Sequence, residues 1–144
     1  MATTPDIEAT ILTLLATLLP SDIVTSPAAS RTAMAGPMRD VDDVGVDMVF
    51  VQASGGVADW HNDGPMPAAS VSVVTRGSRK RYEATRALAL RIHDALHLCG
   101  RRVVGSVVVV DIRASTALPV YLGPGDSDEE LFAESFDVVV EVMS

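Results

Sequence analysis

The stretch that decides the fold runs from Ser70 to Cys99 and reads SVSVVTRGSRKRYEATRALALRIHDALHLC. Up to Arg76, apolar and polar residues alternate with the period of two that a half-buried strand requires. A Gly-Ser pair then breaks the strand. Beyond it, apolar residues recur every three or four positions, which is the stripe of an amphipathic helix. The stretch therefore predicts a strand over 70–76, a tight turn and a helix over 79–97.

The same reasoning predicts one more helix and several more strands. A Leu-rich stripe indicates a helix over about 5–19, with Thr4 as its cap and Pro20 at its end. In the strand expected at 46–52, the inward set is expected to be Val46, Met48 and Phe50, or Val49 and Val51 if both faces are covered. The further strands are expected at 46–52, 103–112, 119–123 (a short edge strand) and 132–143.

Runs of strands with only two helices predict an α+β fold, in which a mostly antiparallel sheet of four to five strands carries two helices packed on one face. A length of 144 residues suits a single domain, 1–144. Two long loops, 20–45 and 55–68, are rich in turn-forming residues. The first is expected to be mostly irregular, with room for one short extended piece.

Composition excludes several classes of protein. Cys99 is the only cysteine, so an intrachain disulfide and a Cys-based metal site are excluded, and folding in a reducing cytosol is expected. The apolar residues 7–19 are too few to span a bilayer and no basic segment precedes them, so neither a signal peptide nor a membrane partner is expected. The net charge of −8 argues against nucleic-acid binding.

The charge is unevenly distributed along the chain. Eight of the eleven basic residues lie between Arg76 and Arg102, where only Glu83 and Asp94 oppose them. That window carries +6 and the remainder carries −14. Such asymmetry can steer association between two faces, including faces of two copies of one protein. The alternative is a helix face that is simply solvated.

Candidate metal and catalytic residues are weak. His93 and His97 stand one helical turn apart, but the zinc-protease pattern needs Glu after the first His, and here Asp94 follows it. The only other histidine is His61, so no metal is expected, and both helix histidines are expected to be cationic at the helix end. The acidic run 126–130 lacks the spacing of a calcium loop. No nucleophile or phosphate-binding motif is present, so neither a cofactor nor enzymatic activity is expected.

Four residues are candidates for a protein interface. Trp60 stands in a polar loop, where it either anchors a partner or folds back onto its own domain. Arg79, Lys80 and Arg81 surround the start of the predicted helix and could meet a phosphate or an acidic face of a neighbouring subunit. Aromatic residues do not interleave with this basic run, so a single-strand nucleic-acid surface is poorly supported.

The order of these elements resembles the tail-terminator or minor capsid protein family of long-tailed bacteriophages. The similar segments cover most of residues 48–142. They are Val49-Phe50-Val51, Gly55-Gly56, Val74-Thr75-Arg76-Gly77, Tyr82-Glu83-Ala84, Ile92-His93-Asp94-Ala95-Leu96, Pro119-Val120-Tyr121-Leu122-Gly123 and Phe136-Asp137-Val138.

The resemblance implies a structural virion protein with an α+β fold and no catalytic residues. Such proteins form a homo-oligomeric ring, typically a hexamer, that caps the tail tube, ends its polymerisation and presents the head–tail joining surface. The implied partners are the tail-tube protein and a head-completion or connector protein, and assembly would take place in the bacterial cytoplasm. The alternatives are another head–tail connector or tail-tube component, and a small cytosolic metal-binding or enzymatic domain.

Overall fold

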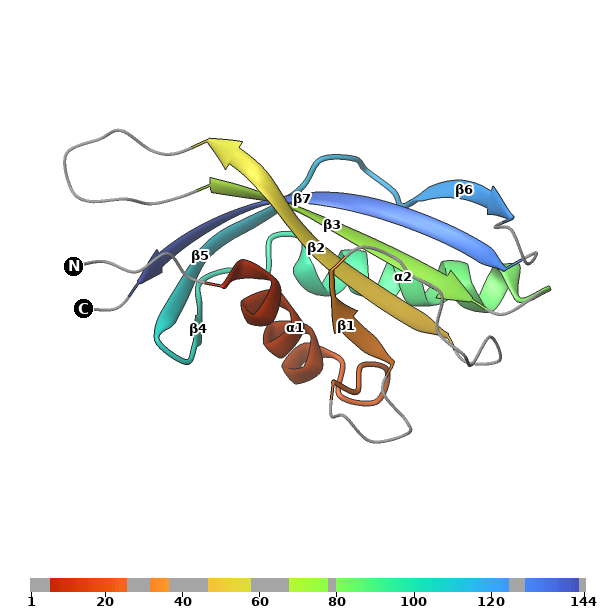
Figure 1. The fold of residues 1–144 in the computed structure, drawn as a ribbon, viewed down its shortest axis with the longest axis horizontal. Helices are drawn as coiled ribbons and strands as arrows, with labels where there is room; N and C mark the ends of the chain where they lie inside the picture. Colours follow the sequence, from red (N-terminus) through yellow and green to blue (C-terminus); the bar gives the residue numbers. More distant parts are fainter. Residues whose placement is uncertain are drawn as a thin grey trace.

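The computed structural model describes residues 6–25, 32–36, 47–57, 68–77, 80–124 and 129–142. These residues form two helices and a seven-stranded mixed sheet, so the expected α+β class is observed (Figure 1). In chain order the elements are α1 Ile7–Leu18, β1 Ala33–Ala35, β2 Met48–Val57, β3 Ala68–Gly77, α2 Tyr82–Leu96, β4 Arg102–Val104, β5 Val107–Ala114, β6 Val120–Pro124 and β7 Glu130–Val142. In the described residues, neither helix is long and apolar enough to cross a membrane.

The last strand, β7, organises the sheet. The strand order is β1-β2-β3-β7-β5-β4, with β6 off this path and paired with β7. One side of β7 pairs with β3, while its other side is shared by β6 near Glu130 and by β5 from Phe136 to Val142. The expected edge strand therefore lies at residues 120–124, beside the first part of β7.

The sheet has more strands than expected and is not wholly antiparallel. The predicted strand 103–112 is two strands, because Gly105 and Ser106 form a tight hairpin turn between β4 and β5. Gly105 has a φ of 59°, which places glycine at the first central position of the turn, as type II′ hairpins require. The short extended piece allowed within 20–45 is β1, which runs parallel to β2.

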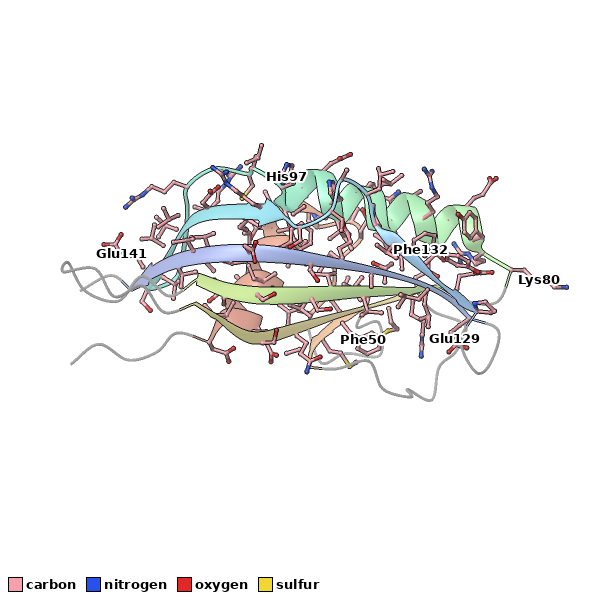
Figure 2. All side chains as sticks on the ribbon, turned by 90° about the horizontal axis from the view of Figure 1, so that it is seen from above. Phe50, Lys80, His97, Glu129, Phe132 and Glu141 are labelled. Carbon is pink, nitrogen blue, oxygen red and sulfur yellow. The ribbon has the colours of Figure 1, made fainter. Side chains whose placement is uncertain are left out.

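Both helices pack on the same face of the sheet, as expected. One buried cluster joins Ile11 and Leu15 of α1, Ile92 of α2, and inward side chains of the sheet such as Val73 and Phe136. Figure 2 shows the strands of the sheet side by side, with α2 running lengthwise in the same direction as the strands. The predicted apolar stripes of the two helices therefore meet in one core.

The strand β2 is buried on both faces, so the alternative assignment of its inward side chains is the correct one. Val49 and Val51 belong to the core under the helices, whereas Met48 and Phe50 form a separate buried cluster with Met34. Two covered faces explain why this strand reads as a continuous apolar run instead of alternating.

Both helices begin later than expected. Asp6, not Thr4, caps α1, because its side chain accepts a hydrogen bond from the Ala9 amide at 3.0 Å. The helix α2 begins at Tyr82, and its N-cap residue, Arg81, makes no capping hydrogen bond with its side chain. The close approach of β3 to α2 requires Gly77, because a Cβ atom there would lie 1.6 Å from Oγ1 of Thr85.

Candidate functional site

A carboxylate is buried in the middle of β7, on the face that packs against α2. Residues at alternate positions of a strand share one face, so Glu134 lies on the same face as Phe132 and Phe136. All three side chains are buried, and Glu134 is only 3% exposed. A buried carboxylate needs a partner, because desolvation penalises its charged form. Glu134 was not predicted from the sequence as a site residue, although its position in the alternating pattern of the strand already indicated burial.

The partner of Glu134 is His93 on α2. Its Nδ1 atom lies 2.8 Å from Oε1 of Glu134, and the imidazole itself is buried. Burial, and to a smaller extent the charge of Asp94, raises the pKa of the Glu134 carboxyl to about 8. The second carboxyl oxygen, Oε2, has no hydrogen-bond partner. The Glu134 carboxyl therefore keeps its proton to a higher pH than an exposed glutamate does.

His97, one turn further along α2, has a different role. Its Nδ1 atom accepts a hydrogen bond from the Ala114 amide of β5 at 3.0 Å, which fixes the end of the helix to the sheet. Both histidines lie at the C-terminal end of α2, as expected: His93 is buried against the sheet in the last turn, and His97, at the C-cap, accepts a hydrogen bond at Nδ1. Within the described parts of the chain, no three His, Cys, Asp or Glu side chains gather closely enough to hold a metal ion.

Cys99, just beyond α2, is partly buried against the core, as suits a free cysteine that packs like a small hydrophobic side chain. Burial raises the pKa of its thiol, although the nearby Arg102 guanidinium opposes this effect. A raised pKa disfavours the thiolate, which is the reactive form of cysteine.

The strand β6 carries an exposed apolar surface. Tyr82 of α2 and Tyr121 of β6 stack edge to face with ring centroids 5.0 Å apart, and both rings contact the buried Phe132. The hydroxyl of Tyr121 donates to Oε2 of Glu130 at 2.5 Å. We call the exposed group the β6 surface; it consists of Tyr82, Leu118, Val120, Tyr121 and Leu122, each at least 41% exposed. Exposed apolar side chains gathered around one edge strand are typical of an interaction site.

Two of the four interface candidates can be placed. Lys80 is exposed, and within the described residues no carboxylate lies within ion-pair distance of it; Figure 2 shows it projecting from the end of the molecule where α2 begins. Arg81 is half exposed and pairs with Asp47 of its own chain at 3.5 Å. Trp60 and Arg79 lie outside the described residues. Of these candidates, the described part of the chain brings together only Lys80 and Arg81, at the turn before α2.

A shallow groove of about 470 Å³ lies between α2 and the start of β2. Four charged side chains line it, and they form two pairs across it: Arg81 with Asp47, and Arg91 with Asp22 through two hydrogen bonds of 3.0 Å. Each charge in the groove already has an opposite partner, so the groove offers no uncompensated charge to a ligand.

Comparison with known proteins shows the fold of the chain. No family of known proteins matches the sequence, and no curated protein does. Among solved structures, the chain is similar to one in a structure described as the virion of a native gene transfer agent particle, with a TM-score of 0.63. The match covers 96% of this chain and 99% of that chain at 13% sequence identity. The whole length of this protein therefore shares the fold of a protein chain that is part of that virion.

Proposed function

We propose that this protein is a structural component of a phage-like virion and acts as a tail terminator. The observation that carries the proposal is the match over nearly the whole of both chains to a protein of a gene transfer agent virion. It supports a structural role in a virion independently of the sequence resemblance, because a fold comparison does not depend on the segments quoted above. The protein would be found at the junction of tail and head.

A terminator acts by occupying the growing end of the tail tube. Its contacts block the site where the next tube subunit would bind and offer a new surface to the head connector. This role requires binding surfaces and no turnover, so we propose that the protein is not an enzyme. The exposed β6 surface and the cation of Lys80 are contact features of the kind that this role needs.

Deletion of the gene from the parent particle tests the proposal. Electron microscopy of the lysate should show tails of uncontrolled length without heads, beside unjoined heads filled with DNA. Complementation with the intact gene should restore joined particles. Tails of normal length, attached to heads in the absence of the protein, would refute the terminator role.

The fold match is equally consistent with another connector or a tail-tube component. The same deletion experiment distinguishes these alternatives from a terminator. Loss of a head-completion protein should leave tails of normal length beside unjoined heads. Loss of the tube protein should leave no tails at all.

A further inference from the structure

Among the described residues, the large exposed hydrophobic side chains fall into two groups, and we propose that these groups are the two halves of a head-to-tail contact between copies of this chain. The inference concerns the ring that the proposed function requires and rests on that proposal. One half is the β6 surface. The other, which we call the β4 surface, consists of Leu98, Arg101, Arg102 and Val103 at the end of α2 and the start of β4.

Each surface includes a strand with an unused edge. In the described residues β6 pairs only with β7, and β4 pairs only with β5. An exposed edge presents free amide and carbonyl groups that can pair with a strand of another chain. Val120 on β6 is 48% exposed and Val103 on β4 is 64% exposed, so each edge also offers apolar side chains to a partner.

The two surfaces lie far apart on one molecule. Figure 1 shows β6 and β4 toward opposite ends of the longest axis, and Figure 2 shows the same separation from another direction. A contact between two different patches of identical subunits is heterologous, and it generates either a closed ring or an open filament. Surfaces at opposite ends of each subunit suit such repeated contacts.

Charge favours a contact between unlike surfaces over one between like surfaces. Arg101 and Arg102 of the β4 surface are exposed, and neither forms an ion pair with another described residue. Beside the β6 surface lie Glu129 and Glu130, the latter bonded to Tyr121. Two β4 surfaces would bring arginines together, whereas a β4 surface against a β6 surface would bring arginines toward glutamates.

Cysteine cross-linking tests this arrangement in purified protein without tails or heads. In a Cys99→Ser background, one variant carries Val103→Cys and a second carries Val120→Cys. Oxidation of their mixture should give covalent dimers, whereas either variant alone should stay monomeric on a denaturing gel. A matched mixture of Gln52→Cys with Val120→Cys should give none, because Gln52 is exposed on a different strand. A chain carrying both cysteines should give a ladder that ends at the size of the ring.

Charge reversal provides a second readout. The double change Arg101→Glu and Arg102→Glu should lower the yield of dimers at least several-fold, and Glu129→Arg with Glu130→Arg in the other partner should restore it. Lys80→Glu, which reverses a cation near the β6 surface, should not lower the yield.

Absence of dimers in the mixture, or dimers from Val120→Cys alone, would overturn the proposed contact. The terminator role is judged separately by the tail lengths in the deletion strain, so the two proposals can fail independently.

Discussion

The imidazole of His93 and the carboxyl of Glu134 are 2.8 Å apart and join the last turn of α2 to β7. Both side chains are buried, 41 residues apart in sequence, in a core that is otherwise mostly apolar. Removing one member of such a pair leaves the other desolvated and unpaired, which costs more than the pair itself contributes.

This pair makes stability depend on pH. The pKa of Glu134 is about 8 in the native state against an ordinary value of 4.5, so between these values the native state holds a proton that the unfolded chain has released. The resulting stabilisation is complete below the ordinary pKa and is lost as pH rises through the folded pKa. The free energy of unfolding should therefore fall as the pH is raised through this window.

Denaturant unfolding of the wild type and of Glu134→Gln at about pH 5, 7 and 9 measures the effect. The glutamine keeps a hydrogen-bonding group near His93 but cannot titrate, and His93 is present in both proteins. The wild type should lose stability relative to the variant as pH rises. Parallel pH profiles of the two proteins would contradict the prediction.

Gly77 should be intolerant of even the smallest side chain. A Cβ atom there would overlap Thr85 of α2, which is itself held by a hydrogen bond of 2.7 Å from its hydroxyl to the Arg81 carbonyl. Gly77→Ala should therefore force the strand and helix apart and cost about 1–3 kcal/mol, the usual range for overpacking. Ser72→Ala on the same strand is a suitable control. Equal unfolding midpoints for the two variants would show that the packing relaxes without cost.

Truncation of the two helix stripes should show that they share one core. Ile92 of α2 and Leu14 of α1 are at most 3% exposed, so Ile92→Ala or Leu14→Ala should each cost about 2–5 kcal/mol. Leu118→Ala, at a side chain that is 59% exposed, should change stability by less than about 0.5 kcal/mol. The free energies of unfolding of the purified variants test whether the two stripes share one core. Equal losses of stability for the buried and the exposed truncations would contradict it.

Elements with a strong local period were predictable from the sequence. The alternation before Gly77 and the stripe after it correspond to β3 and α2, because a half-covered strand and an amphipathic helix leave their periods in adjacent residues. The hairpin at Gly105 was missed although a Gly-Ser pair between two Val-rich runs is a known turn signal. The three residues of β1 carry no such signal, because their strand exists only through pairing with β2.

The candidate site was less predictable because its parts come from distant segments. Alternation indicates that Glu134 faces inward, but no local pattern says that His93 is its partner. The β6 surface was equally hard to predict. Its sequence, Leu-Pro-Val-Tyr-Leu, indicates a partly buried edge strand. Only the order of the strands in the sheet shows that the outer edge of β6 has no described neighbour.

Lys80 should contribute to binding of the tail tube. Arg81 is already paired with Asp47, which leaves Lys80 as the exposed cation described at this turn. Lys80→Glu should weaken co-sedimentation with tail tubes, and the loss should be largest at low salt, because the Debye length is only about 8 Å at physiological ionic strength. Arg86→Glu makes the same charge change at an exposed position within α2 and serves as the control. Equal binding by the two variants at every salt concentration would remove Lys80 from the interface.

Trp60 should anchor the protein to its partner in the virion. It is the only tryptophan of the chain and stands in a loop sequence rich in Gly, Pro and Asp, and tryptophan is enriched among residues that dominate binding energy. Complementing the deletion strain with Trp60→Ala should give a weaker form of the deletion phenotype, with a broader distribution of tail lengths and fewer joined particles. Trp60→Phe should retain most function, because it keeps a large aromatic surface.

The free energy of unfolding of purified Trp60→Ala separates the two roles of this side chain. The substitution leaves that free energy unchanged if Trp60 is an anchor, and lowers it if Trp60 is folded onto its own domain. Normal tails from a Trp60→Ala variant would exclude the anchor role.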